Sequence, residues 1–302
     1  MAGLPTPAND MTNTGHLVSF SFKMSQEAYS AETRVRYERS LRTLISRGAD
    51  LTNPESVKNV ISMQKWQDGT KQSVANAVLL FYKFNGITAQ LPNYKIQPKI
   101  AFIPTESEID QLVSGCKHRL ATFLQTLKET ACRYGEAYAL EWTDFDPENQ
   151  TLTINHPEKG SLPRQPHIST RLQAMINQLP RTSKRIFDYG SKDIIRKNFQ
   201  RARRRIAKNT GNPRLLQIHF HTFRHWKAST FYHDTNNVIK TMQLLGHKCL
   251  NNTQRYIQLF PDLPDKYVTE ISYTLEEDKK LLDAGYEFQT ERDGAKLYRK
   301  RK

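Results

Sequence analysis

The sequence has few cysteines and no long apolar run. Its three cysteines, Cys116, Cys132 and Cys249, are odd in number and share no metal-like spacing. That usage argues against a disulfide framework and favours a reducing compartment with unpaired thiols. No apolar stretch approaches the roughly 18 residues that a membrane helix requires. The first nineteen residues also lack the basic start and apolar core of a signal peptide. These absences predict a soluble, cytoplasmic protein.

Acidic residues are scarce relative to basic ones. The chain has 45 Lys and Arg against 30 Asp and Glu, a formal charge of +15 and a pI near 9.7. Such an excess favours a polyanionic partner, because neutralising phosphates releases counterions and dominates non-specific affinity. Ribosomal and membrane-surface proteins are basic as well, so charge alone does not select a function.

The N-terminal third predicts a small basic helical module. The first nineteen residues are rich in Pro, Thr, Asn and Gly, and a disordered leader is predicted over residues 1–24. Apolar spacing and stop signals predict helices at 25–48, 54–63 and 70–85. The simplest interpretation is a helical bundle with a solvated charged face, but the cations favour DNA contact. The predicted contact residues are Arg34, Arg36, Arg39, Arg42 and Lys71.

The remaining chain predicts a linker, a larger domain and a tail. Residues 91–104 carry three prolines and no helical period, which is typical of an interdomain linker. Thr105 and Glu108 have capping-box spacing and predict a helix start. The larger domain is predicted over 105–265. Strands 151–155 and 164–169 are expected to form a hairpin around 158–160. Its expected helices are 106–116, 119–131, 170–179, 191–209, 221–233, 236–245 and 251–258. The fold class is therefore mainly α with a small antiparallel sheet (α+β).

Two further segments carry a pattern of their own. After Asp193 the helix at 191–209 has seven cations and no acid, which favours a phosphate-facing surface over a solvated one. Its predicted DNA contacts are Arg196, Arg201, Arg203 and Arg204. The tail, 266–302, predicts a helix at 274–284 followed by a hairpin about Asp293-Gly294.

The residues that point to chemistry lie near the C-terminal end. His221-Thr-Phe-Arg224-His225 is followed by Leu245-Gly246-His247 and, nine residues later, by Tyr256. An arginine binds phosphate bidentately, histidines move protons, and a supported tyrosine is a credible nucleophile. This set suits the cleavage of one phosphodiester.

These motifs, with a further box upstream, resemble the tyrosine recombinase (phage-integrase) family. Ala131-Cys-Arg133-Tyr-Gly-Glu136 resembles the first arginine box of the family, and Lys159 lies where the family keeps its catalytic lysine. His221-x-x-Arg224 and Leu245-Gly246-His247 with Tyr256 match the later boxes. The resemblance covers about residues 25–260 and implies a C-shaped, two-domain DNA clamp. Its N-terminal half would be a helical core-binding (SAM-like) domain over 25–90.

The resemblance also implies a role for each residue. Arg133 and Arg224 would hold the phosphate charge in place of a metal, and Tyr256 would attack phosphorus to form a 3′-phosphotyrosyl link. Lys159 would protonate the leaving 5′-oxygen, and His221 would act as acid or base toward the tyrosine proton. His247 would donate to a phosphate oxygen, and Glu136 would support the site. No metal, cofactor or nucleotide is expected.

Several positions have an alternative interpretation. Arg133 alone is compatible with a surface arginine, and Arg164 competes with Lys159 for the role of the lysine. Trp142 is predicted to belong to the core. His219, His221 and His225 approximate a zinc cluster, but no acidic or cysteine ligand lies nearby in the sequence. His225 is therefore expected to pack within the helix or to support the site.

Three departures from the family pattern affect fine geometry rather than reacting groups. The first box reads Ala131-Cys132 where the family usually has Gly and a hydrophobic residue. Phe223 stands where Leu is commoner, and Trp226-Lys227 where small residues are usual.

The expected partner is double-stranded DNA, cut and rejoined at recombination sites of a mobile genetic element. A homo-tetramer on synapsed DNA is expected, with the tail docked on a neighbouring subunit and with an accessory directionality factor as a further partner. A type IB topoisomerase, a catalytically silent DNA-binding protein and a non-specific RNA-binding protein remain as alternatives. The target sequence, the direction of recombination and cleavage in cis or in trans stay open.

Overall fold

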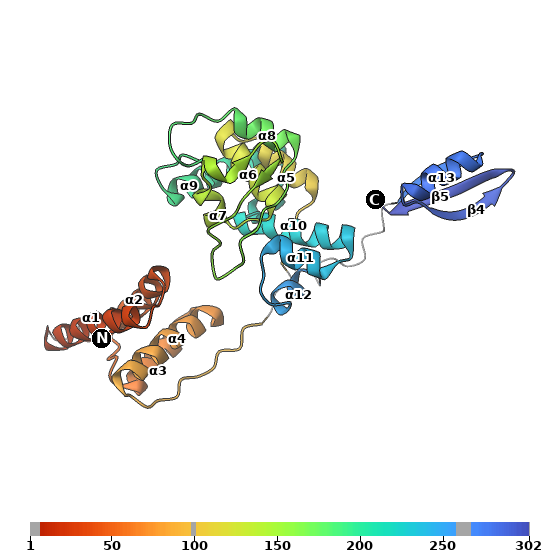
Figure 1. Cartoon of the computed structure of the whole chain (residues 1–302). Coiled ribbons are helices and arrows are strands. Elements are labelled where there is room, and N and C mark those ends of the chain that lie inside the picture. The colour runs from red at the N-terminus through yellow and green to blue at the C-terminus, as the bar shows by residue number, and fades with distance from the viewer. Residues whose placement is uncertain (1–6, 98–100, 258–266, 302) are drawn as a thin grey trace. The chain divides into compact units, whose positions relative to one another are not determined.

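The computed structural model describes residues 7–97, 101–257 and 267–301 (Figure 1). The chain divides into two compact units, Met1–Lys99 and Ile100–Lys302. No helix within the described ranges is both long and apolar enough to cross a bilayer. The fold class is as predicted, with helices predominating and two small antiparallel sheets.

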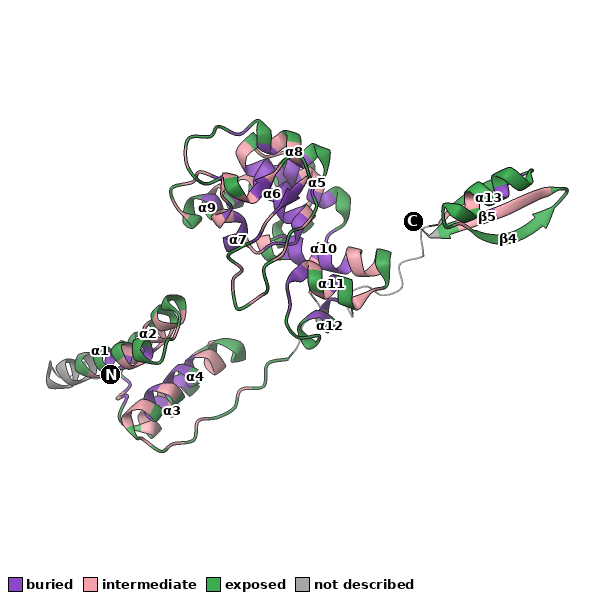
Figure 2. Cartoon of the chain, viewed as in Figure 1, coloured by how far each residue is buried: buried purple, intermediate pink, exposed green. Residues whose placement is uncertain are grey.

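The N-terminal unit is a four-helix module. Asn53 caps the third helix by accepting from the backbone of Glu55 and Ser56, and Gly86 ends the fourth in a left-handed conformation with φ +67°. Buried residues of all four helices form one core, and Figure 2 colours buried residues purple. The helices are α1 (Pro7–Gln26), α2 (Ala31–Ile45), α3 (Pro54–Met63) and α4 (Asp68–Asn85).

The prediction of a disordered leader over residues 1–24 is wrong for residues 7–24, which belong to helix α1. Leu17, Phe20 and Met24 are spaced three and four residues apart and are buried. The Phe20 ring packs edge-on against Phe81 of α4 with centroids 5.7 Å apart. The polar composition of the leader conceals this apolar face, whose partner lies about sixty residues away in the chain. Residues 1–6 lie outside the described ranges.

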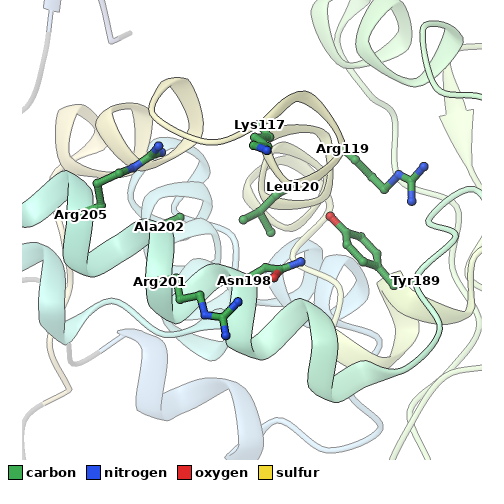
Figure 3. Close-up of a pocket in the computed structure, with 8 residues that line it drawn as sticks. All are labelled: Lys117, Arg119, Leu120, Tyr189, Asn198, Arg201, Ala202 and Arg205. Carbon is green, nitrogen blue, oxygen red and sulfur yellow. The ribbon is translucent and has the colours of Figure 1, made fainter.

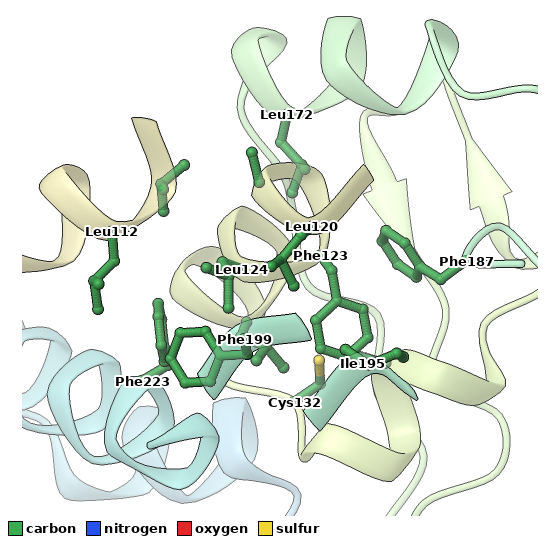
Figure 4. Packing of buried hydrophobic residues seen from close by; sticks show 14 of the residues in the cluster. Leu112, Leu120, Phe123, Leu124, Cys132, Leu172, Phe187, Ile195, Phe199 and Phe223 are labelled. Atoms are coloured by element: carbon green, nitrogen blue, oxygen red, sulfur yellow. The ribbon is translucent and has the colours of Figure 1, made fainter. Parts of the chain in front are cut away.

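The second unit is built around helix α6. Ten of its thirteen residues are buried, and α5, α8, α9 and α10 pack around it. Phe123 contacts the rings of Phe187 and Phe220, and Figure 4 shows Leu120, Leu124 and Phe199 in the same cluster. The elements are α5 (Glu106–Ser114), α6 (His118–Thr130), α7 (Tyr134–Ala139), η1 (Trp142–Asp144), β1 (Phe145–Asp146), β2 (Thr151–Leu152), α8 (Thr170–Asn177), α9 (Lys192–Thr210), η2 (Pro213–Gln217), α10 (Phe220–Thr235), α11 (Val238–Leu245) and α12 (Asn251–Ile257).

Local signals in this unit are confirmed and the predicted hairpin is corrected. Thr105 and Glu108 form the expected capping box of α5. The expected strands 151–155 and 164–169 meet only through the isolated bridges Thr151–His167 and Ile154–Arg164. Strand β2 also pairs in register with β1, a pairing that was not predicted. Trp142, predicted as core, is half-buried at the edge of the core with Arg181 over its ring.

The C-terminal segment forms a three-stranded antiparallel sheet with one helix. The helix and the hairpin agree with the sequence, whereas strand β3 was not predicted. Its partner β5 lies about thirty residues away, so no local turn signal marks the pair. The order is β3-β5-β4, and Tyr298 is buried against Phe288. The elements are β3 (Tyr267–Ser272), α13 (Leu275–Asp283), β4 (Glu287–Arg292) and β5 (Ala295–Arg301). The expected start of the tail at residue 266 lies outside the described residues.

Candidate active site

The predicted reacting residues line one pocket of about 440 Å³ in the second unit. The pocket is formed by the segment between α6 and α7, the loop after β2, helix α10, the turn after α11, and helix α12. It is also lined by Ser161, Lys248 and Asn252, to which no sequence motif pointed. The lining residues are Arg133, Lys159, Gly160, Ser161, His221, Arg224, His247, Lys248, Asn252 and Tyr256.

Arg224 is held rigidly at the base of the pocket. Its residue is 1% exposed, and its two terminal nitrogens donate to the carbonyl oxygens of Ala131 and Leu245, each at 2.6 Å. Desolvation, and then the charge of Arg133, lowers the pKa of Arg224 to about 10. The group is still a cation at neutral pH. A buried guanidinium with fixed carbonyl acceptors is preorganised to receive an anion.

Ala131, which supplies one of these carbonyls, has a left-handed conformation with φ +51°. It ends helix α6 and is fully buried. Glycine adopts this conformation without a Cβ penalty, which accounts physically for the glycine that is usual at this position of the resembled family.

Arg133 is fixed by contacts on several sides. Its Nη1 donates to Glu136 Oε1 at 2.8 Å and to Ser161 Oγ at 2.6 Å, and it lies 3.2 Å from the carbonyl of Glu158. The backbone N–H of Arg133 donates to the other oxygen of Glu136 at 2.8 Å. Ser161 thus helps to orient the arginine, a role without a signal in the sequence.

Glu136 is the buried carboxylate of the site. Its side chain is fully buried between Arg133 and Arg164, whose Nη2 lies 2.5 Å from Glu136 Oε2. Burial alone would raise the pKa of this carboxyl, but the hydrogen bonds and charge of Arg164 and Arg133 lower it to about 2. Arg164 is therefore the ion-pair partner of Glu136. It does not line the pocket, so it does not compete with Lys159 for the role of the catalytic lysine.

Lys159 lies on the loop after β2 and is exposed at the pocket, with a left-handed φ of +57°. The loop is attached to the end of α11, because the backbone N–H of Leu162 donates to the carbonyl of Gly246 at 2.8 Å. Gly246 has φ +66°, and a Cβ there would lie 2.7 Å from the carbonyl oxygen of Leu162. Only glycine allows this approach.

His221 is a neutral histidine at physiological pH. Desolvation, followed by the charges of His225 and Arg224, lowers the pKa of His221 to about 4 although the side chain is open to the pocket. A neutral imidazole can accept a proton. His219, the third histidine of the zinc alternative, instead contacts Arg203 at 3.1 Å.

His247 has a defined tautomer. Its Nε2 lies 3.1 Å from Arg224 Nη2, which can only donate, so Nε2 accepts. The proton of the neutral ring is then on Nδ1, which donates to Thr253 Oγ1 at 3.0 Å. In this tautomer Nε2 carries no proton, so the donation to a phosphate oxygen expected of His247 requires a second proton on the ring.

Tyr256 lies on α12 in the same pocket as the arginines of its own chain. The residue is 4% exposed, and its ring is near His225 and His247, with centroids 5.0 and 5.9 Å away. His225 also meets the His221 ring edge-on at 4.5 Å. His225 therefore contacts both His221, the expected base, and Tyr256, the expected nucleophile, which is a position from which it can support the site.

Comparison with known proteins adds to this geometry. The model of the phage integrase family matches residues 104–262, more than half of the chain. The chain belongs to the phage integrase family. It is 24% identical over 201 residues to tyrosine recombinase XerA of Saccharolobus solfataricus. That match covers 65% of this chain and 66% of the relative, just under two thirds of the relative's length.

Solved structures share the fold of this phage integrase family member. The Tn1549 transposon integrase in complex with transposon right end DNA superposes with a TM-score of 0.63 at 12% identity, covering 89% of this chain and 99% of that one. A lambda integrase dimer bound to a COC′ core site gives 0.64 at 13% identity, covering 84% and 98%. At these identities the likeness shows the fold.

The predicted DNA contacts of the N-terminal unit differ in exposure. Arg36, Arg39 and Arg42 are exposed on α2. Arg34 is half-buried, and its Nε is buried without a hydrogen-bond partner. Lys71 of α4 lies 5.8 Å from the ring centre of Tyr94.

The cations of α9 do not share one surface. Arg201 and Arg204 are exposed, and Arg196 is exposed with its Nη2 2.5 Å from Asp193. Arg203 is 9% exposed, and its guanidinium donates inward to the carbonyl of Ile218. The prediction that Arg203 faces phosphate is therefore wrong, because its position on the helix turns it into the core.

Proposed function

We propose that this family member is a site-specific DNA recombinase that cleaves and rejoins DNA through a phosphotyrosyl intermediate. The observation that carries the proposal is the single pocket lined by Arg133, Arg224, His221, His247 and Tyr256 of one chain. Two guanidiniums with fixed contacts supply the donors that a pentavalent phosphorus needs. The proposal requires no metal, cofactor or nucleotide.

The proposed step forms one bond and breaks one. The Tyr256 oxygen attacks phosphorus while neutral His221 takes up the phenol proton, and the bond to the 5′-oxygen breaks. Lys159 donates a proton to that oxygen, leaving a 5′-hydroxyl and a 3′-phosphotyrosyl link. A 5′-hydroxyl from another strand then reverses the step, with proton transfers in the opposite direction.

The proposed partner is double-stranded DNA, bound both by the helical core-binding module and by the catalytic unit. The DNA-bound state of the Tn1549 and lambda integrase structures supports this partner. We further propose a tetramer on synapsed sites, with the C-terminal sheet docked on a neighbouring subunit. A directionality factor and an origin in a mobile element belong to the same hypothesis.

The position of Tyr256 beside the arginines of its own chain supports cleavage in cis. Mixing Tyr256→Phe with Arg224→Ala protein tests this, because each defective chain lacks a different part of the site. Cis cleavage predicts no adduct from the mixture. Recovery of adduct in the mixture would contradict cis cleavage while leaving the tyrosine mechanism intact.

The main experiment traps the covalent intermediate. The full-length protein is incubated, in a metal chelator, with nicked suicide duplexes from a library of candidate sites. Wild type and Tyr232→Phe, a matched tyrosine of α10, should give denaturant-resistant adducts, and Tyr256→Phe should give none. DNA binding without an adduct would favour a silent binder, and relaxation of supercoils regardless of sequence would favour a topoisomerase. An adduct with Tyr256→Phe would show that another residue is the nucleophile.

A further inference from the structure

A second cavity lies at the other end of helix α6 from the catalytic pocket. It has a volume of about 430 Å³ and lies between the start of α6, the residue Tyr189 and one face of α9 (Figure 3). None of its lining residues also lines the catalytic pocket. They are Lys117, Arg119, Leu120, Tyr189, Asn198, Arg201, Ala202 and Arg205.

The charges around this cavity are all of one sign. Four of its eight lining residues are cations, and none is acidic. Arg119 and Arg205 donate only to backbone carbonyls, those of Asp188 at 2.6 Å and Gly115 at 2.5 Å. Lys117 and Arg201 make no side-chain hydrogen bond or ion pair with the described residues. Four like charges around one hollow repel one another, and a bound anion removes that repulsion.

The middle of the cavity is different in character. Figure 3 shows Leu120 and Ala202 between the cations, with the Asn198 amide beside them and the Tyr189 hydroxyl directed toward Leu120. The Asn198 side chain is half-buried and has no hydrogen-bond partner among the described residues. An amide offers both a donor and an acceptor, as the edge of a nucleobase does. The apolar floor and the tyrosine suit the faces of a planar ring.

The start of α6 adds a weaker contribution. Its N-cap, Lys117, provides no side-chain hydrogen bond to the first turn. Backbone N–H groups of that turn are therefore left for another acceptor, and the helix dipole favours negative charge there. Like the cationic side chains, this helix start favours a negatively charged ligand.

We propose that this cavity binds a nucleotide, with its phosphate on the cations of α6 and α9 and its base against Leu120, Tyr189 and Asn198. The volume lies within the range of small-molecule pockets, about 300–1,000 Å³. The nucleotide has two possible sources, a free nucleoside phosphate or one nucleotide of a bound DNA strand. The inference stands on residues that take no part in the proposed cleavage step.

The first arm of the test uses free ADP and full-length protein without DNA. Calorimetry should show ADP binding to wild type, with inorganic phosphate binding more weakly because it cannot use the apolar floor. Arg201→Gln should weaken ADP binding about tenfold, the usual effect of losing one charged hydrogen bond. Asn198→Leu should weaken ADP but not phosphate. Lys208→Gln, an exposed cation of α9 outside the cavity, is the matched control and should have no effect.

The second arm applies to the DNA source. Phosphate-ethylation interference on a bound duplex should reveal a contact that is present in wild type and Lys208→Gln but absent in Arg201→Gln. ADP binding supports the free nucleotide, and this contact without ADP binding supports a DNA nucleotide. Failure of both arms overturns the proposal, as does equal affinity for phosphate and ADP, which would indicate a simple anion site. The covalent adduct of Tyr256 with DNA tests the recombinase proposal in a separate assay. The nucleotide-site proposal and the recombinase proposal can therefore fail independently.

Discussion

The cationic side chains near the two ends of helix α6 differ in whether other protein groups hold them in place. At its C-terminal end, Arg224 and Arg133 are fixed by backbone carbonyls and by the buried carboxylate of Glu136. At its N-terminal end, Lys117 and Arg201 are free of protein partners among the described residues. The first arrangement holds a cation in one geometry before a ligand arrives, as catalysis requires. The second leaves side chains to adapt on binding, at a cost in side-chain entropy.

The largest expected effect comes from removing the carboxylate that holds the arginines at the C-terminal end of α6. Glu136→Gln removes a buried charge that pairs with two partly buried arginines, so we expect the free energy of unfolding to fall by about 3 kcal/mol and the covalent adduct to be lost. Denaturant titration and the suicide-substrate assay measure both. Glu106→Gln is the matched control, because its carboxylate is 65% exposed and 2.9 Å from Lys128; its effect should stay below about 1 kcal/mol. Equal effects of the two changes would contradict the contrast.

Two neighbouring arginines of α9 provide the same contrast on a smaller scale. Arg203→Gln leaves the carbonyl of Ile218 without its donor and should reduce the free energy of unfolding by about 2 kcal/mol. Arg201→Gln removes an exposed cation and should change it by less than about 0.5 kcal/mol. Urea titration of both proteins tests this. A stability loss at Arg201 would mean that its side chain has a structural partner.

The orientation of His247 in the catalytic pocket depends on one hydroxyl group, that of Thr253. Thr253 is fully buried and accepts from His247 Nδ1. Thr253→Val should slow adduct formation about tenfold, ~1.4 kcal/mol in barrier, with little change in DNA affinity. Thr253→Ser should restore the rate, because it keeps the hydroxyl. An unchanged rate in Thr253→Val would show that Thr253 does not orient His247.

The smallest expected effect is a pH dependence of stability. The pKa of His221 is about 4 in the folded protein and ordinarily 6.5, so the unfolded chain binds the proton more readily. Its contribution to stability is therefore complete above pH 6.5 and is lost as the pH falls toward 4. Between about pH 7 and about pH 5, the Tm of wild type should fall more than that of His221→Gln. Glu136, with a pKa of about 2 and an ordinary value of 4.5, acts only at lower pH. Parallel Tm curves would contradict the shift at His221.

Local sequence signals predicted the elements that local interactions define. The cap at Asn53-Pro54 and the capping box of Thr105 give helix starts within a few residues of their observed positions. The boxes placed Arg133, Arg224 and Tyr256 in one pocket, because their order along the chain reflects a common fold.

Features that depend on distant partners were missed. Strand β3 pairs with β5, and α1 is held by Phe81 of α4, so neither has a nearby signal. The face that each residue of α9 presents could not be inferred from a run of cations, and Arg203 was assigned to the wrong side. The pairing of Arg164 with Glu136 joins residues 28 positions apart and likewise has no pattern in the sequence.

The short backbone contact between Leu162 and Gly246 has a consequence for the thermodynamics of DNA binding. The loop that carries Lys159 is anchored on one side by this hydrogen bond and on the other by the bridge of Ile154 with Arg164. Between these two points Arg133 also contacts Glu158 and Ser161, so Lys159 and Gly160 are among the few residues left to order themselves around a phosphate. Each residue that need not be immobilised on binding spares about 1–2 kcal/mol of conformational entropy. In the proposed DNA complex, Gly246 would thus contribute to affinity by holding this loop in place before the DNA binds.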